Sequence, residues 1–349
     1  MLSRLRTGTP VLAATCLAIL SGTARADTLP GYDRIGFSAA HRAGLIQGAV
    51  WYPMGTMTYR VRIGDNALFK GADVALGAGV KAGRFPLVLL SHGSGGNMDG
   101  LAWLASELTA AGYIVLAVNH PGSTSGDSSP RRSMEIWKRA QDLSAALDFT
   151  LAEPAFGRHI DRDRVAAMGF SLGGLTVLQL GGLVPDKQAF IDYCARMDGA
   201  RDCLFLAKGG VSLANIDTRA FERPAREPAV RAVVAVDPGM GFAFKDESVR
   251  AANLPIRIIN LGDGTDLWPE VDAGPQGSNL AQRLPQGSLS RVTPADHYSF
   301  LAECKPGARE RLAAEKDDPI CHDVAGSVRP VVHQEVVRQT VAFLKTALK

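Results

Sequence analysis

Short apolar runs alternate with longer segments of helical periodicity along most of the chain. The runs over 85–90, 113–118 and 230–236 contain almost no polar side chains, which is typical of strands buried on both faces. Between them, segments such as 133–151 place apolar residues three or four positions apart, as in helices that cover a sheet. The alternation predicts an α/β fold with a mostly parallel central sheet flanked by helices.

The other elements follow from the same reading. The stretch 122–132 is rich in Ser, Gly, Asp and Pro and is expected to form an exposed loop. Residues 184–228 break the alternation and are irregular, and they are too long for an ordinary connection. They predict an inserted cap over a site, with a surface excursion that never meets substrate as the alternative. Strands are predicted over 48–52 and 59–63 (both antiparallel), 85–90, 113–118, 165–169, 230–236, 254–261 and 288–292, and helices over 98–111, 133–151, 172–183 and 330–348.

The first 26 residues have the pattern of a removable export signal. Arg4 and Arg6 precede an apolar run over 11–20, and Ala24-Arg25-Ala26 fits a cleavage site. The run is too short to span a bilayer as a stable helix. We therefore expect cleavage after Ala26, no stable membrane anchor, and residues 27–349 as a single domain that is periplasmic or secreted. A membrane anchor or a disordered start is the alternative.

Composition and charge narrow the class of partner. The 349 residues are 46% hydrophobic and 21% charged, as in globular proteins. The formal net charge is +3, and because the first 26 residues carry three arginines and no acid, the rest of the chain is neutral overall. A nucleic-acid partner is not expected, since its phosphates require a basic surface. Nothing in the sequence specifies an oligomeric state.

The cysteines predict disulfides. Removal of the leader takes Cys16 away and leaves four cysteines, an even number that favours two bridges in an exported chain. Loop geometry favours the local pairs Cys194–Cys203 and Cys304–Cys321 over the other connectivities, and free thiols are the alternative. The sequence has no Cys-x-x-Cys pair and no His and Cys set with the spacing of a zinc site.

The segment Gly169-Phe170-Ser171-Leu172-Gly173 carries the strongest chemical signal. A serine between two glycines, after a buried strand and before a helix, matches a nucleophile elbow. The serine would occupy a strained turn, and side chains two residues to either side would collide with neighbouring backbone. Ser171 is therefore the predicted nucleophile, against the alternative of a glycine-rich turn with a solvated serine.

A serine nucleophile needs a histidine as base and a carboxylate that orients the histidine. In folds with this elbow, the carboxylate comes first after the serine in the chain and the histidine comes second. His297 lies in the loop after the last predicted strand and is the expected base. His322 follows Cys321 in a loop, and His333 falls in the terminal helix, where a solvated or capping role is the default.

Four carboxylates compete for the role of the acid. Asp237 ends the strand over 230–236, at the edge of the sheet where active sites gather, and it is the preferred acid. Asp263 and Asp266 follow the next strand among glycines, where a turn role explains them well. Asp296, beside the histidine, is the remaining alternative.

Two backbone amides are expected to bind the oxyanion of a tetrahedral intermediate. One is the amide of Leu172, directly after the nucleophile, and the other comes from the loop after the strand over 85–90. In that loop Ser94 is preferred, because glycines on both sides let its backbone approach closely. His92 is expected to hold the loop.

With these residues the chain resembles the α/β-hydrolase superfamily. More closely, it is similar to bacterial predicted dienelactone hydrolases and to platelet-activating-factor acetylhydrolases, over about residues 45–345. The resemblance rests on Trp51-Tyr52-Pro53, Ser91-His92-Gly93-Ser94-Gly95, Gly169-Phe170-Ser171-Leu172-Gly173-Gly174, Asp237 and His297. It implies that Asp237 is the acid in preference to Asp266, and that Ser94 and Leu172 supply the oxyanion donors.

The chain also departs from these families. Dienelactone hydrolases have a cysteine in the elbow where position 171 is serine, which argues against lactone opening as the main activity. The segment 184–228 has no counterpart in the acetylhydrolases, so their specificity does not carry over.

These observations predict an exported serine esterase for small-molecule or lipid-like esters, which requires no metal or organic cofactor. Ser171, His297 and Asp237 would form the catalytic triad. The alternatives are an acyltransferase that uses the same nucleophile, a catalytically silent binding protein on the same scaffold and, as the weakest, a metal-dependent hydrolase.

Overall fold

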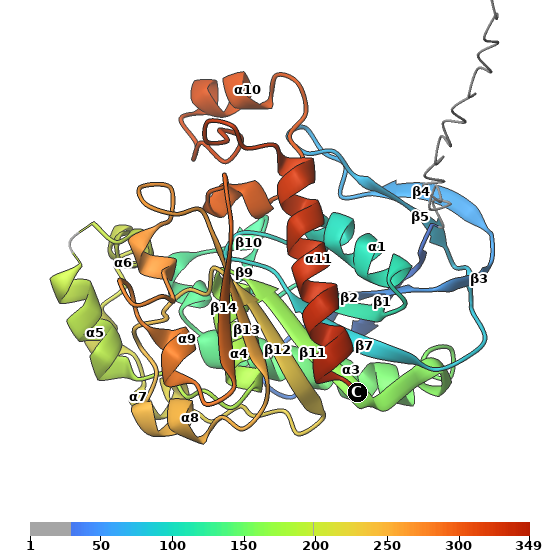
Figure 1. Cartoon of the computed structure of the whole chain (residues 1–349), viewed down its shortest axis with the longest axis horizontal. Helices are drawn as coiled ribbons and strands as arrows, with labels where there is room; N and C mark the ends of the chain where they lie inside the picture. The colour runs from blue at the N-terminus through green and yellow to red at the C-terminus, as the bar shows by residue number, and fades with distance from the viewer. Residues whose placement is uncertain (1–28, 198) are drawn as a thin grey trace, which may run out of the picture.

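The computed structural model describes residues 29–197 and 199–349 (Figure 1), so the predicted signal over residues 1–26 and its cleavage site lie outside the described residues. A ten-stranded sheet forms the centre of the molecule. From one edge to the other its strands are β14 (Gly287–Val292), β13 (Ile256–Leu261), β12 (Val230–Val236), β11 (Ile160–Phe170), β7 (Phe85–Ser91), β8 (Ile114–Val118), β2 (Ile46–Tyr52), β1 (Gly31–Phe37), β5 (Ala72–Leu76) and β4 (Tyr59–Ile63).

The sheet is mostly parallel, as predicted. The six strands from β14 to β8 all run in the same direction. At the other end, β2 is antiparallel to both β1 and β8, and β4 is antiparallel to β5, which confirms the expectation for the first two predicted strands. The sequence analysis did not anticipate β1 and β5, which pair in parallel with each other beside these antiparallel strands.

Helices cover both faces of the sheet (Figure 1). On one face lie α1 (Ala102–Ala110) and α11 (Arg329–Ala347), and on the other α3 (Ile136–Ala152) and α4 (Leu172–Leu180). Because side chains alternate along a strand, Val88 and Leu90 of β7 pack toward the first pair, whereas Leu87 and Leu89 pack toward the second. Burial on both faces explains why the central strands read as continuous apolar runs.

The stretch 122–132 is less exposed than predicted. It contains β9 (Ser123–Thr124), β10 (Asp127–Ser128) and most of α2 (Pro130–Ser133). Ser123 and Thr124 are buried, since their hydroxyls find partners inside the protein, including a hydrogen bond of 2.8 Å from Thr124 Oγ1 to the His120 carbonyl oxygen. The prediction of an exposed loop therefore holds for residues 125–128, 131 and 132 and fails for the buried start of the segment.

The segment 184–228 is also more regular than predicted. It forms α5 (Lys187–Arg196), α6 (Arg201–Lys208), the 3-10 turn η3 (Leu213–Asn215) and α7 (Thr218–Phe221). The disulfide Cys194–Cys203 joins α5 to α6, and Cys304–Cys321 brackets α10 (Ala308–Glu315), which stands apart from the sheet in Figure 1. Both expected pairings are confirmed.

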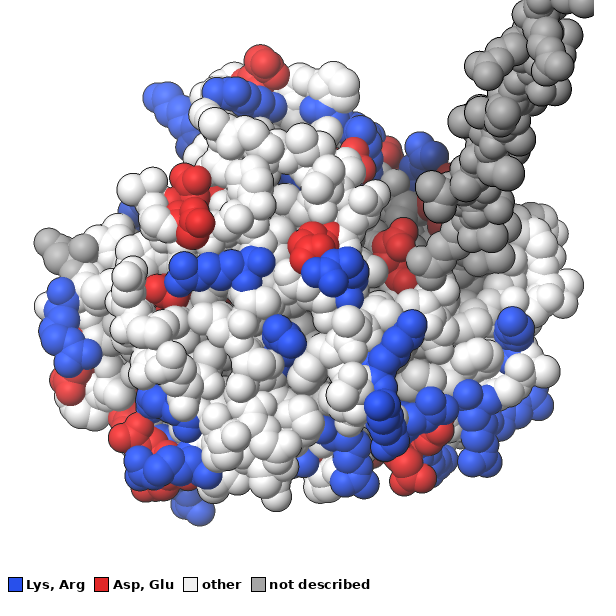
Figure 2. Space-filling model, viewed as in Figure 1, with Lys and Arg blue, Asp and Glu red and all other residues white. Residues whose placement is uncertain are grey.

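Within the described residues, no helix combines the length and the apolar character needed to cross a membrane. Figure 2 shows Lys and Arg side chains interspersed with Asp and Glu on the face it draws, in keeping with a chain of nearly balanced charge.

The remaining elements are short. They are β3 (Met54–Thr56), β6 (Gly79–Val80), α8 (Asp246–Ala251), α9 (Leu280–Arg283), η1 (Asp99–Leu101), η2 (Gly157–His159), η4 (Pro269–Val271) and η5 (His297–Phe300).

Candidate active site

Ser171 lies in a strained turn between β11 and α4. Its backbone has φ 55° and ψ −121°, a conformation that L-residues rarely adopt. The flanking glycines leave no room for a side chain: a Cβ on Gly169 would lie 2.1 Å from the Gly173 carbonyl oxygen, and a Cβ on Gly173 would lie 2.1 Å from the Ser91 carbonyl oxygen. The steric demand predicted for these two positions is confirmed.

The structure brings His297 and Asp237 together with Ser171. The Nε2 atom of His297 lies 3.1 Å from Ser171 Oγ, and its Nδ1 lies 2.9 Å from Asp237 Oδ2. The imidazole is buried and lies near two aromatic rings, with ring centroids 4.5 Å away at Phe170 and 4.4 Å away at Trp268. These rings limit rotation of the imidazole between its two hydrogen-bond partners.

Asp237 is held by groups from the neighbouring strand. It is fully buried and has φ 41°. Its Oδ1 accepts hydrogen bonds from the Leu261 amide at 2.9 Å and from Asn260 Nδ2 at 3.0 Å, which leaves Oδ2 for the imidazole. The pairing of Val236 with Ile259 sets this arrangement, because it puts the following residues, Asp237 and Asn260, side by side.

Asn260 is a site residue that the sequence analysis missed. Besides Asp237, it binds the Val271 carbonyl oxygen at 2.8 Å and the Ala273 amide at 3.1 Å, so it ties the acid to the segment around η4. The available signal was an amide side chain within an otherwise apolar strand, Ile256–Leu261, in which burial requires partners.

The two predicted oxyanion donors flank the serine. Leu172 is the first residue of α4, and Ser94 follows Gly93, where an added Cβ would lie 3.2 Å from Ser171 Cβ. Within the described residues, neither the Ser94 amide nor the Leu172 amide donates a hydrogen bond. Both amide protons are therefore available to a ligand beside Ser171.

His92 has the contacts of a loop anchor. Its Nδ1 donates to the Gly93 carbonyl oxygen at 2.7 Å, and its Nε2 accepts from the His120 amide at 3.2 Å. Burial lowers the pKa of the His92 imidazole well below its usual value, so the ring stays neutral and Nε2 stays an acceptor. The loop is further fixed by a hydrogen bond from the Gly95 amide to the Ser123 carbonyl oxygen at 2.9 Å.

Comparisons with known proteins agree with this architecture. The family model described as alpha/beta hydrolase fold matches residues 86–188, which include most of β7, the loop that carries Ser94, and the elbow around Ser171. A solved ferulic acid esterase from Streptomyces cinnamoneus superposes with a TM-score of 0.61 and 16% identity, covering 92% of this chain and 90% of that one. The chain has the α/β-hydrolase fold. The predicted superfamily resemblance and fold class are thereby confirmed.

Curated relatives match over a smaller part. The chain is 33% identical to cutinase est2 of Thermobifida alba over 106 residues, which are 30% of this chain and 32% of that protein. It is 26% identical to the bis(hydroxyethyl) terephthalate hydrolase of Streptomyces coelicolor over 123 residues, 35% of this chain and 37% of that protein. The chain thus spans about a third of the length of the curated relatives it matches.

None of the three other candidate carboxylates of this α/β-hydrolase fold forms a hydrogen bond with the His297 imidazole. Asp296 caps η5, since its Oδ1 accepts hydrogen bonds from the amide and the hydroxyl of Ser299 at 2.9 and 2.8 Å. Asp263 and Asp266 belong to a turn closed by a hydrogen bond of 3.0 Å from the Asp266 amide to the Asp263 carbonyl oxygen. Asp237 is the carboxylate that meets the imidazole.

The other late histidines lie in different surroundings. His322 is exposed beside the Cys304–Cys321 disulfide. His333 is buried, stacks on Trp103 at 3.7 Å and bonds to the Leu301 carbonyl oxygen at 3.0 Å, and burial lowers the pKa of its imidazole to about 4. The solvated or capping role expected for His333 is wrong, because α11 packs that face against α1.

A cavity of about 1460 Å³ opens above Ser171 and His297 at the carboxyl ends of the parallel strands. Leu204 and Phe205 of α6 line one wall and are 43% and 37% exposed. The segment after α10 lines another wall and includes Asp317 and Asp318. The site therefore lies between the main sheet and the two segments that contain the disulfides.

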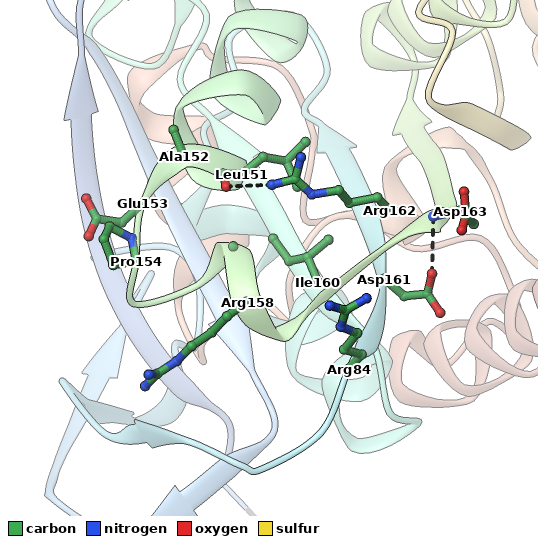
Figure 3. Close-up of a pocket in the computed structure, with 11 residues that line it drawn as sticks. Arg84, Leu151, Ala152, Glu153, Pro154, Arg158, Ile160, Asp161, Arg162 and Asp163 are labelled. Atoms are coloured by element: carbon green, nitrogen blue, oxygen red, sulfur yellow. Dashed lines mark hydrogen bonds between the residues drawn. The ribbon is translucent and has the colours of Figure 1, made fainter.

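A second, smaller hollow lies at the opposite end of the sheet. Figure 3 shows it around the start of β11, with Arg84, Arg162 and Asp161 among the residues that line it. β11 extends from Ile160 to Phe170, so this hollow lies about 30 Å from Ser171 at the usual rise per residue. Its charges are of both signs, and it shares no lining residue with the site at Ser171.

The described residues also bear on metal binding. Across residues 29–197 and 199–349, no group of three or more His, Cys, Asp or Glu side chains is arranged to hold a metal ion.

The close approach at the elbow leads to a stability prediction. Gly173→Ala would place a Cβ 2.1 Å from the Ser91 carbonyl oxygen, so the end of β7 and the start of α4 would have to separate. We expect a loss of about 1–3 kcal/mol in unfolding free energy and a melting temperature lower by several degrees. Differential scanning calorimetry measures the melting temperature.

Gly79→Ala is the matched control, because a Cβ at Gly79 has open space around it and the residue lies outside the positive-φ region. Equal melting temperatures for the two variants would contradict the tight packing at the elbow.

Proposed function

We propose that the protein is an exported serine hydrolase that cleaves carboxylic esters through an acyl-enzyme. The observation that carries the proposal is the pair of hydrogen bonds that links Asp237, His297 and Ser171 beside two unoccupied amide protons. The predicted signal over residues 1–26 and the two disulfides support export.

In the proposed acylation step, Ser171 Oγ attacks the ester carbonyl carbon while His297 Nε2 takes the hydroxyl proton. Asp237 accepts the hydrogen bond from Nδ1–H, which fixes the tautomer and stabilises the imidazolium that forms. The amides of Ser94 and Leu172 donate to the oxyanion, whose charge develops only in the transition state. The imidazolium then returns the proton to the departing alcohol oxygen, and the C–O bond breaks.

Deacylation repeats these roles with water as the nucleophile. His297 Nε2 takes a proton from a water molecule that attacks the acyl carbon, and the same two amides hold the second oxyanion. Collapse of this intermediate returns the proton to Ser171 Oγ and releases the carboxylic acid. No step requires a metal or an organic cofactor.

The proposed substrates are small-molecule or lipid-like esters without negative charge. Phe170 and Trp268 lie beside the imidazole, and Phe205 lines the same cavity, so apolar and aromatic groups find favourable surfaces there. The carboxylates of Asp317 and Asp318 on another wall disfavour anionic esters. The match to cutinases and to a terephthalate ester hydrolase supports this substrate class.

We propose further that the segment 184–228 acts as a cap. Arg201, at the start of α6, lies over the Trp268 ring at 3.9 Å and donates to Glu270 Oε1 at 3.0 Å. Since Trp268 stacks in turn on His297, α6 is fixed directly beside the proposed base. This contact favours a cap over an excursion remote from the substrate.

Turnover of p-nitrophenyl butyrate tests the reaction. We expect the protein to hydrolyse this ester and to react covalently with a fluorophosphonate, and Ser171→Ala to lose labelling and at least about 10⁴-fold in kcat. Labelling is read by intact-mass spectrometry, and folding of the variant by circular dichroism. Folded wild-type protein that neither labels nor turns over the ester would contradict the proposal, and transfer of the acyl group to an added alcohol in preference to water would indicate an acyltransferase.

Two matched variants test which carboxylate is the acid of the triad. Asp237→Asn should lower kcat by about 10⁴-fold because the imidazole loses the partner that fixes its tautomer. Asp266→Asn, which alters a carboxylate in a turn, should leave kcat within twofold of wild type. The reverse order of effects in steady-state kinetics would assign the acid to Asp266.

The cap is tested through substrate size. Phe205→Ala removes a partly exposed ring from the cavity wall, so kcat/KM for p-nitrophenyl benzoate should fall roughly fivefold while that for the acetate stays within twofold. Tyr59→Ala, on β4 and 80% exposed, removes a ring outside the cavity and serves as control. Equal changes for both esters would contradict a cap role.

A further inference from the structure

Arg139 is a fully enclosed arginine on α3 that the proposed reaction does not use. It is 2% exposed, yet its guanidinium donates to four side-chain or carbonyl oxygens from three other parts of the chain. We infer that Arg139 is a positioning residue that holds both amide donors of the oxyanion hole in place. The inference rests on the proposed function.

One side of the guanidinium fixes the loop that carries Ser94. Its Nη2 donates to the His92 carbonyl oxygen and, at 3.3 Å, to Ser91 Oγ, while Nη1 donates to Ser123 Oγ. The Ser123 carbonyl oxygen in turn accepts the Gly95 amide at 2.9 Å. Arg139 therefore binds the loop just before Ser94 and also binds the segment that pairs with the loop just after it.

The other side of the guanidinium is linked to the start of α4 through Thr176. Arg139 Nε donates to Thr176 Oγ1 at 2.9 Å, and the Thr176 hydroxyl donates to the Leu172 carbonyl oxygen at 2.9 Å. Leu172 carries the second proposed amide donor. One planar cation thus spans the two backbone segments whose relative position decides whether both amides point at the same oxygen atom.

A defined chain of hydrogen bonds orients this cation. Asp142 Oδ2 lies 2.9 Å from His120 Nδ1, and a carboxylate can only accept, so the proton lies on Nδ1. His120 Nε2 then accepts from the Ser91 hydroxyl at 2.9 Å, which leaves the Ser91 oxygen to accept from Arg139. Burial lowers the pKa of His120 to about 3, so the ring stays neutral and the direction of the chain is retained.

Asp142 also supplies the nearby negative charge that a buried guanidinium requires. Burial raises the pKa of the Asp142 carboxyl, but hydrogen bonds from His120, His41 and Arg42 outweigh it and hold the pKa well below its usual range. The carboxylate is therefore ionised one helical turn from Arg139. Arg42 binds it at 2.8 and 2.7 Å and also donates to the Pro121 carbonyl oxygen at 3.0 Å, without a hydrogen bond to the loop of Ser94 or to α4.

A merely structural arginine would stabilise the fold without a specific effect on the transition state. The two roles differ in what a substitution changes, because oxyanion donors act on the transition state more than on the bound ester. A lysine at position 139 keeps the positive charge but cannot donate to Thr176, Ser123 and His92 together in one plane. Arg139→Lys therefore separates charge from geometry.

The test measures kcat and KM for p-nitrophenyl butyrate and the inhibition constant of butylboronic acid, whose tetrahedral adduct with a serine carries an oxyanion-like group. For Arg139→Lys we expect kcat to fall roughly 10- to 100-fold, less than for outright loss of a donor. The KM should change less than threefold, and the affinity for the boronic acid should fall by about the same factor as kcat. In Arg139→Ala, millimolar guanidinium chloride should restore part of kcat.

Arg42→Lys is the matched control, since it alters the same Asp142 network away from the loop. It should lower the melting temperature while kcat stays within threefold of wild type. Thr176→Val is an isosteric change that removes the hydroxyl linking Arg139 to Leu172 and leaves the hydrogen-bond partners of Arg139 on the Ser94 side in place. It should lower kcat by a smaller factor, and it carries the test if the Arg139 variants do not fold.

The inference is overturned if folded Arg139→Lys and Thr176→Val keep wild-type kcat and boronic acid affinity, whatever happens to their melting temperatures. A wild-type protein that neither hydrolyses the ester nor reacts with a fluorophosphonate overturns the proposed function instead, and the inference with it. The two failures are distinguishable, because the wild-type protein still hydrolyses the ester when only the inference about Arg139 fails.

Discussion

The backbone contact between the elbow and the end of β7 determines how the whole site is assembled. Gly173 packs against the Ser91 carbonyl oxygen and Gly169 against the Gly173 carbonyl oxygen so closely that no side chain fits at either position. This contact sets the distance between the strained Ser171 turn and the loop of Ser94. A strained turn persists only where its surroundings hold it, and here the surroundings are two other backbone segments.

The order of the strands in the sheet brings the other site residues together. β11 lies between β7 and β12, so the residues that end these three strands meet at one edge: the loop after Ser91, then Ser171, then Asp237. His297 comes from further away, since β14 is two strands beyond β12. The Asp296 cap on η5 and the ring of Trp268 set its return toward the serine.

The sequence predicted what is encoded locally. Ser171 was identified from a strand, a turn and two glycines within a short segment, and chain order then led to Asp237 and His297. Asn260 and Arg139 could not be assigned a role in this way, because a polar residue in an apolar or amphipathic segment indicates a buried partner but does not identify it. Their partners are distant in the chain, as with Asn260 and Asp237. The burial of Ser123 was missed for the same reason: its hydroxyl accepts a hydrogen bond from the guanidinium of Arg139 on α3.

The two sides of the cavity are held by different physical means. On the side of the proposed oxyanion donors, buried polar groups such as Arg139 and Asp142 have hydrogen-bond partners, an arrangement that makes movement costly. On the side of the proposed cap, Asp202 Oδ2 is buried without a partner among the described residues, and burial raises the pKa of that carboxyl to about 6. The same helix carries the partly exposed Leu204 on the cavity wall, and a disulfide joins α5 to α6. Oxyanion donors must be fixed before the charge develops, whereas a wall that contacts different ester groups can adapt. Changes in substrate preference among relatives should therefore concentrate on α5 and α6, while α3 and the loop after β7 stay constant.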